Sequence, residues 1–196
     1  MKGRNIFLIV IIALILILGG CGCSGYNRLV GQDETVKKAW ANVQTDYQKR
    51  ADLVPNLVAT VKGAANFEQE TLTRVIEARA KATSVNISAD SLTPANIQKF
   101  QAAQSELSGA LSRLLVSVER YPELKANQNF LQLQGQLEGI ENGIRNSRKG
   151  FNDAVNTYNV QVRSFPTNIF AGMFGFKQKQ PFAADEGAQT APKVQF

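Results

Sequence analysis

The sequence contains no histidine, and its two cysteines, Cys21 and Cys23, both lie among the first 25 of 196 residues. The rest of the chain therefore has neither thiol nor imidazole. These absences exclude from it a zinc site of the usual kind, a nucleophile that depends on cysteine or histidine, and an internal disulfide. An enzyme that works with carboxylates alone stays compatible with this composition.

Proline is also scarce, with six residues in the whole chain, and aromatic residues make up 8% of it. No segment shows the strict two-residue alternation of a half-buried strand. Alanine, glutamine, leucine and valine are abundant instead, and this composition favours helices. The sequence therefore predicts an all-α protein.

Positive charge is present in excess but not clustered. The net charge is +6 and the isoelectric point is near 9.4. Basic pairs such as Lys37-Lys38 and Lys49-Arg50 are spread along the chain and interleaved with acidic residues. This pattern indicates a solvated basic surface, compatible with anionic lipid, and it predicts no nucleic-acid partner.

The N-terminus carries one long apolar run. Thirteen apolar residues follow one another from Ile6 to Leu18, after a short basic lead. The uncharged stretch continues to Asn27, which is long enough to span a bilayer. Leu18-Gly19-Gly20-Cys21 also resembles a lipobox, in which cleavage would leave a lipidated Cys21. Residues 1–25 are thus predicted to be a transmembrane anchor or a lipoprotein signal.

Flanking charge gives the expected sidedness. Lys2 and Arg4 precede the apolar run, whereas Arg28 alone follows it closely. Such asymmetry favours an N-terminus on the inside and a folded domain on the exported side. We therefore expect a single-pass inner-membrane protein, or a lipoprotein anchored through Cys21.

Apolar residues recur at alternating steps of three and four along four later segments, which is the spacing of amphipathic helices. The first helix is expected over 26–62 with a kink at Pro55, and the second over 66–82. The third should begin at Pro94 and close before Pro122, and the fourth should end near Arg163, before Pro166. Four such helices bury their stripes most simply as an antiparallel up-down-up-down four-helix bundle.

This organisation divides the chain into four parts. The anchor over 1–25 precedes the bundle over 26–165. An apolar C-terminal foot over 166–182 follows, and a disordered tail over 183–196 ends the chain.

One charged residue falls on an apolar seam. Arg50 occupies a seam position of the first helix, where an unpaired charge would be too costly to keep. We expect it to join a polar network between helices that fixes their register. The candidate members are Arg50, Asp52 and Asn56 on the first helix, and Glu138, Glu141, Asn142 and Arg145 on the fourth. Acid/base catalysis by Glu138 and Glu141 is the alternative, but their i,i+3 spacing beside an arginine is typical of ion pairs.

The foot is rich in phenylalanine and contains two lysines. In an up-down-up-down bundle it returns to the side of the anchor, where rings and lysines suit the headgroup boundary. The alternative is that the rings plug the open end of the bundle core. The candidate membrane-contact residues are Phe165, Ile169, Phe170, Met173, Phe174 and Phe176.

Several motifs occur in order between residues 26 and 182. They are Tyr26-Asn27-Arg28-Leu29-Val30, Trp40-Ala41-Asn42-Val43, Arg50-Ala51-Asp52-Leu53-Val54-Pro55-Asn56-Leu57-Val58, Val61-Lys62-Gly63, Glu77-Ala78-Arg79, Tyr121-Pro122-Glu123-Leu124-Lys125-Ala126-Asn127, Leu137-Glu138-Gly139, Glu141-Asn142, Tyr158-Asn159, Phe165-Pro166 and Gly175-Phe176. Taken together, they give the chain a resemblance to the LemA family of bacterial membrane-anchored helical proteins. It implies a four-helix bundle behind one N-terminal membrane segment, with no catalytic residues to carry over.

The expected function is a structural, scaffolding or protein-interaction role in the bacterial envelope, without enzymatic activity. The implied partners are the membrane and other envelope proteins. No catalytic residue, metal, cofactor or small-molecule substrate is implied. Two alternatives stay open: a carboxylate-dependent hydrolase of envelope polysaccharide, and a bundle that binds lipid or a small ligand in a cavity.

Overall fold

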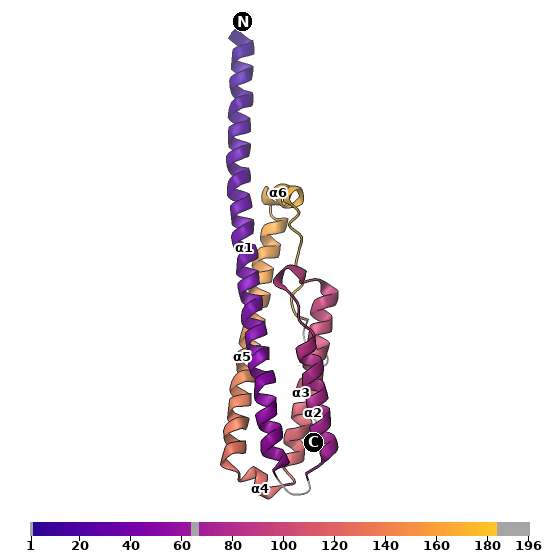
Figure 1. Ribbon diagram of the computed structural model, residues 1–196. Coiled ribbons are helices and arrows are strands. Elements are labelled where there is room, and N and C mark those ends of the chain that lie inside the picture. Colours follow the sequence, from indigo (N-terminus) through magenta and orange to yellow (C-terminus); the bar gives the residue numbers. More distant parts are fainter. Residues whose placement is uncertain (1, 64–66, 184–196) are drawn as a thin grey trace, which may run out of the picture.

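The computed structural model describes residues 2–63 and 67–183, with only some of the side chains among the first 23 (Figure 1). The described residues form helices and no strand, which confirms the all-α prediction. The elements are α1 (Lys2–Lys62), α2 (Gln69–Ser84), the short 3-10 helix η1 (Ala89–Ser91), α3 (Pro94–Val118), α4 (Pro122–Lys125), α5 (Gln128–Arg163) and α6 (Thr167–Phe174).

Helix α1 is longer than the sequence predicted, because the expected anchor and the first bundle helix are one helix. It has 61 residues, or about 90 Å at 1.5 Å per residue. Pro55 lies inside it without ending it. Figure 1 shows the N-terminal part of α1 projecting beyond all other elements. Within the described residues, no helix is long and apolar enough to cross a membrane, so the expected spanning segment is not confirmed.

Local signals set most of the other helix ends. The Thr93 side chain accepts a hydrogen bond from the Asn96 backbone and Pro94 begins α3, as predicted. Asn127 caps α5 by accepting from the Asn129 and Phe130 backbones. The predicted start of the second helix at Asn66 lies outside the described residues.

The helices α1, α2, α3 and α5 lie alongside one another (Figure 1). α1 packs along α5 and also against α2, and α2 packs against α3. The short α6 contacts both α1 and α5 near the end from which α1 projects (Figure 1).

The buried side chains form two clusters, one after the other along the helices. The aromatic core holds Trp40, Tyr47, Phe100, Phe151, Tyr158 and Phe182, with aliphatic neighbours such as Val36 and Ile87. The aliphatic core holds mainly leucine and valine, such as Leu57, Val61, Leu72, Leu107, Leu114 and Leu137, together with Phe130. The aromatic core is the one nearer α6, because Ala171 of α6 belongs to it.

The predicted foot over 166–182 consists of two parts with different structures. Its first part is α6, which ends at Gly175 in a left-handed conformation with φ +77°. Residues 177–183, which we call the strap, have no regular structure, and Phe182 is buried in the aromatic core. Its ring packs among Trp40, Phe100 and Phe151, which agrees, for this residue, with the alternative that rings of the foot fill the bundle core. The predicted disordered tail lies outside the described residues from 184 onward.

Candidate functional site

Arg50 is the centre of a buried polar arrangement that joins three helices. Its side chain is 1% exposed. Nη1 donates to the Ser108 hydroxyl at 2.6 Å and lies 3.0 Å from Oε1 of Glu141. Nη2 donates to the Gln104 backbone carbonyl at 3.1 Å and to Oε1 of Gln104 at 2.7 Å. One guanidinium thus connects α1 with α3 and α5.

These four residues, Arg50, Gln104, Ser108 and Glu141, form what we call the polar layer. It lies between the two cores on every helix that contributes to it. On α1, Tyr47 belongs to the aromatic core and Leu53 to the aliphatic core, with Arg50 between them. The same order holds for Gln104 on α3 and for Glu141 on α5. The polar layer therefore interrupts the apolar interior at one level of the molecule.

The partners of Arg50 compensate almost fully for the energetic cost of burying its charge. A buried cation is costly unless it is paired and hydrogen-bonded. Here a carboxylate, two side-chain oxygens and a backbone carbonyl receive the guanidinium, which also lies 4.9 Å from the ring centre of Tyr47. Among the described residues, Nε of Arg50 is the buried side-chain polar atom left without a hydrogen-bond partner.

A second arginine explains how α1 tolerates Pro55. Proline has no backbone N–H, so the carbonyl four residues earlier loses its usual helical donor. That carbonyl belongs to Ala51, and Nε of Arg79 on α2 donates to it at 2.7 Å. The Arg50–Val58 motif and the Glu77-Ala78-Arg79 motif therefore meet at this bond. The proline creates an acceptor on α1, and α2 supplies the missing donor.

The polar layer includes fewer of the predicted residues than expected. Asp52 and Asn56 are both exposed; Asp52 accepts from Gln48 of its own helix, and the Asn56 carbonyl accepts from Thr60. The predicted contacts of these two side chains between helices are not seen: the hydrogen bonds at both residues stay within α1, although Asp52 lines a pocket between α1 and the end of α2. On α5, Asn142 and Arg145 bond to each other and are exposed. Glu138 is exposed as well.

Glu138 and Glu141 line a surface hollow between α3 and α5, which is the place a carboxylate enzyme would need. The hollow has a volume of about 520 Å³. Its α3 wall consists of Ser108, Leu111, Ser112 and Leu115, so the described residues place no acid opposite the two glutamates. Glu141 is also engaged by Arg50. The arrangement therefore suits an ion pair better than acid/base catalysis.

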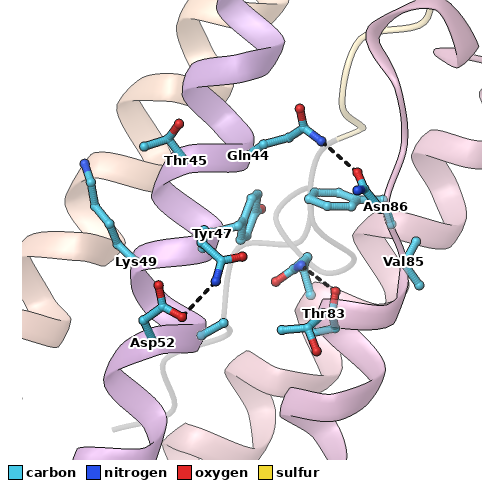
Figure 2. A pocket seen from close by; sticks show the side chains of 13 residues that line it. Gln44, Thr45, Tyr47, Lys49, Asp52, Thr83, Val85 and Asn86 are labelled. Carbon is cyan, nitrogen blue, oxygen red and sulfur yellow. Dashed lines mark hydrogen bonds between the residues drawn. The ribbon is translucent and has the colours of Figure 1, made fainter.

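Another pocket lies between α1 and the end of α2, close to Tyr47 and Phe100 (Figure 2). Its polar side chains already bond to one another, to backbone carbonyls of their own helices or to a neighbouring acid. Gln44 donates to Asn86 at 3.2 Å, as Figure 2 shows, and Gln48 donates to Asp52 at 2.7 Å. Since these groups already satisfy each other, the pocket does not present a converging set of free donors to a ligand.

The predicted membrane-contact residues divide between solvent and packed surroundings. Phe170 lies against α1, where a Cβ at Gly22 would come within 2.9 Å of its ring. Phe176 packs against the aromatic core and against the Tyr26 ring. The remaining four are exposed: Phe165 by 81%, Ile169 by 52%, Met173 by 73% and Phe174 by 54%. We call these four the apolar patch.

The predicted lipidation residue, Cys21, lies in α1, but its side chain is not among those that the structure describes. Other residues with clear roles did not enter the predicted network. Gln104 and Ser108 complete the polar layer, and Arg79 fills the acceptor that Pro55 creates. The sequence could have indicated Gln104 as a member of the network, because it is a polar residue at an apolar seam position of its helix, as Arg50 is. No sequence feature pointed to Ser108.

These features define the class of protein: all-helical and elongated, with a buried polar layer between two cores. The sequence pattern of the LemA family matches residues 39–196, and the chain belongs to that family. The match begins later than the resemblance over 26–182 and continues to the last residue.

Individual relatives are distant in sequence but similar over most of the chain. Protein LemA of Metamycoplasma hominis is 24% identical over 160 residues, which are 82% of this chain and 69% of that protein. Magnetosome protein MamQ 2 of Paramagnetospirillum magneticum is 23% identical over 182 residues, covering 84% of this chain and 67% of the relative. Magnetosome protein MamQ of Magnetospirillum gryphiswaldense is 24% identical over 176 residues, covering 80% and 64%.

Proposed function

We propose that this chain is a membrane-anchored, non-enzymatic protein of the bacterial envelope that acts through protein contacts. Residues 26–165 would form an antiparallel four-helix bundle held to the membrane by residues 1–25. Membership of the LemA family and similarity to magnetosome proteins agree with a membrane-associated role. The anchor would be the apolar run itself or a lipid on Cys21.

The position of the apolar patch is the observation that carries this proposal. Phe165, Ile169, Met173 and Phe174 are exposed and belong to α6 or precede it closely, and α6 lies at the end of the molecule from which α1 projects (Figure 1). The projecting part of α1 contains the run of thirteen apolar residues. A cluster of large exposed apolar side chains marks an interaction surface, and a membrane beside an apolar helix would cover this one.

The Tyr26 ring supports the same orientation. It lies 4.9 Å from the ring of Phe174 and 5.8 Å from that of Phe176. Tyrosine is enriched where a protein crosses the headgroup region, since one end of the ring is apolar and the other is wet. Tyr26 and the apolar patch would then mark the level of the bilayer surface.

Quenching by brominated lipids tests this placement in the full-length protein in anionic vesicles. The only tryptophan is Trp40, so Trp40→Phe gives a background for a single reporter. A reporter at Phe174→Trp should be quenched strongly by lipids brominated on the acyl chain. The matched reporter Val116→Trp, at an exposed position near the distal end of α3, should not be. Equal quenching of both reporters, or none at residue 174, would contradict the proposal.

Sidedness and partners need two further measurements. Protease accessibility in intact cells, with mass spectrometry of the mature N-terminus, would distinguish a spanning helix from lipidation at Cys21.

Crosslinking in cells before purification should recover reproducible envelope proteins. Repeated recovery of none, with the membrane preserved, would contradict an interaction role.

A further inference from the structure

The strap packs against a surface formed by α1, α5 and the start of α3, which we call the groove, and two asparagines of α5 hold its backbone. Oδ1 of Asn159 accepts from the Lys179 N–H and its Nδ2 donates to the Lys179 carbonyl, both at 2.8 Å. Asn152 binds Phe182 in the same way, accepting from its N–H at 2.8 Å and donating to its carbonyl at 3.3 Å. Each amide side chain therefore binds both polar groups of one strap residue.

The spacing of the two asparagines matches an extended chain. Asn152 and Asn159 are seven residues apart on a helix, which is about 10.5 Å at 1.5 Å per residue. Lys179 and Phe182 are three residues apart, which is about 10 Å for an extended segment. The rise of two turns of α5 thus equals the length of three residues in an extended peptide. Because the bonds go to backbone atoms, this recognition does not depend on the side chains of the bound segment.

Two side-chain sites add selectivity at these same positions. Nζ of Lys179 lies 2.9 Å from a carboxylate oxygen of Asp33, with both side chains at least four-fifths buried, and 5.3 Å from the Tyr158 ring centre. Three residues on, the Phe182 ring lies within 6.5 Å of three aromatic rings and 5.1 Å from the Arg148 guanidinium. The groove therefore holds a cation and, three residues later, an aromatic ring.

All these recognition groups belong to the helices and not to the strap. Within the described residues, 177–183 makes no backbone–backbone hydrogen bond to the helices. The strap residues at 177, 178 and 180 are exposed. The groove would keep its asparagine pair, its acidic site and its aromatic site if the strap left.

We propose that this groove is a binding site for an extended peptide with a Lys-x-x-Phe pattern, occupied in cis by the chain's own strap. Its ligand in trans is a segment of a partner protein that carries a cation three residues before an aromatic residue. The strap acts as a resident competitor, because a tethered segment has a high effective concentration at its own groove. This proposal rests on the proposed interaction role and gives the partner's chemistry.

A synthetic peptide with the strap sequence Lys-Gln-Lys-Gln-Pro-Phe-Ala is the probe. It is titrated against the full-length protein in detergent, without membranes, and binding is followed by anisotropy of a label on the peptide. Trp40 is a second reporter, because its ring stacks on Phe182 at 5.9 Å. Bilayer quenching at residue 174 is independent of this titration, so failure of the two proposals can be told apart.

Releasing the strap should open the site. Phe182→Ser should bind the peptide at least tenfold more tightly than the unsubstituted protein, whose groove is filled. Peptide binding should also shift Trp40 emission in Phe182→Ser back toward the emission of the unsubstituted protein. If Phe182→Ser does not fold, Lys179→Glu weakens the strap without removing a core ring, and a several-fold gain is expected.

Matched controls distinguish binding at this site from nonspecific binding of the peptide. In the Phe182→Ser background, Asn152→Leu and Asn159→Leu should each weaken peptide binding at least tenfold while preserving side-chain size. A peptide with serine in place of its phenylalanine, or glutamate in place of its second lysine, should bind at least tenfold more weakly. Any of three results would overturn the proposal. The peptide could bind to neither Phe182→Ser nor Lys179→Glu, it could bind equally to the strap-released and the unsubstituted protein, or the altered peptides could bind as tightly as the original one. Dimers that form by exchange of straps would assign the groove to a second copy and would also overturn it.

Discussion

The two sides of the polar layer are built from similar helices but are filled differently. On the aliphatic side, α1, α2, α3 and α5 all contribute side chains, and leucine and valine supply most of the interior. On the aromatic side, α2 has ended and α3 has just begun. There α1 and α5 are covered by the segment that contains Ile87 and Leu92, and by the strap.

This difference accounts for the distribution of aromatic residues. Where four helices contribute side chains, leucine and valine fill most of the interior. Two long helices covered by irregular segments leave wider spaces, and Trp40, Phe100, Phe151 and Phe182 fill them with larger rings. Trp40 also donates to the Ile87 carbonyl at 3.0 Å, which ties the irregular segment to α1.

Removing the largest ring should affect the aromatic side most. Trp40 is fully buried and contacts the rings of Phe100, Phe151 and Phe182. We expect Trp40→Ala to lower the free energy of unfolding by about 4 kcal/mol, because it leaves a cavity and an unpaired Ile87 carbonyl. Urea denaturation followed by circular dichroism measures this. Val116→Ala, at a side chain 70% exposed, should change it by less than about 0.5 kcal/mol.

A cavity on the aliphatic side tests whether the two sides unfold together. We expect Leu114→Ala, at a fully buried residue, to cost about 3 kcal/mol. Trp40 emission reports on the aromatic side alone, whereas circular dichroism reports on all helices. Because α1 and α5 run through both cores, both signals should shift to the same lower urea midpoint. Separate midpoints would mean that the polar layer divides the molecule into two cooperative units.

Replacing the cation in the polar layer should have a smaller effect. We expect Arg50→Met to lower the free energy of unfolding by about 2 kcal/mol, since Gln104 and Ser108 lose a charged donor while Glu141 can still reach solvent. Lys149→Met is the matched control, because Lys149 is 77% exposed and should matter little. An increase in stability for Arg50→Met would mean that the layer serves helix register at a cost in stability.

At pH values only just above 10, raising the pH should give the smallest of these effects, confined to the aromatic side. Burial, with a further contribution from Asp33, raises the pKa of Tyr158 from 10.0 to about 12. Between these values the folded state keeps the phenol proton and the unfolded state releases it, so the free energy of unfolding falls as pH rises. Tyr158→Phe should make that fall shallower above pH 10. Below about pH 9 the curves of variant and parent should run parallel, and a parallel course up to pH 12 would contradict the assignment.

The repeating apolar steps were enough to predict the helices, because burial of one face is a local property of each segment. The starts at Pro94 and after Asn127 follow from capping groups that are also local. Arg50 could be recognised as a residue that needs partners, since a charge on an apolar seam is costly in any arrangement. Glu141 was within the predicted set, whereas Asp52 and Asn56 are exposed and their hydrogen bonds stay within α1.

What the sequence by itself determined is the helical class, most helix ends and the need of Arg50 for a partner. Tertiary structure alone decided that Arg79 meets the carbonyl freed by Pro55, that Ser108 completes the polar layer and that Phe182 enters the aromatic core. These contacts join residues 28, 58 and 142 positions apart, as for Arg79 with Ala51, Arg50 with Ser108, and Phe182 with Trp40. Such partners depend on how whole helices are placed against one another, and helical periodicity within one segment carries no information about that placement.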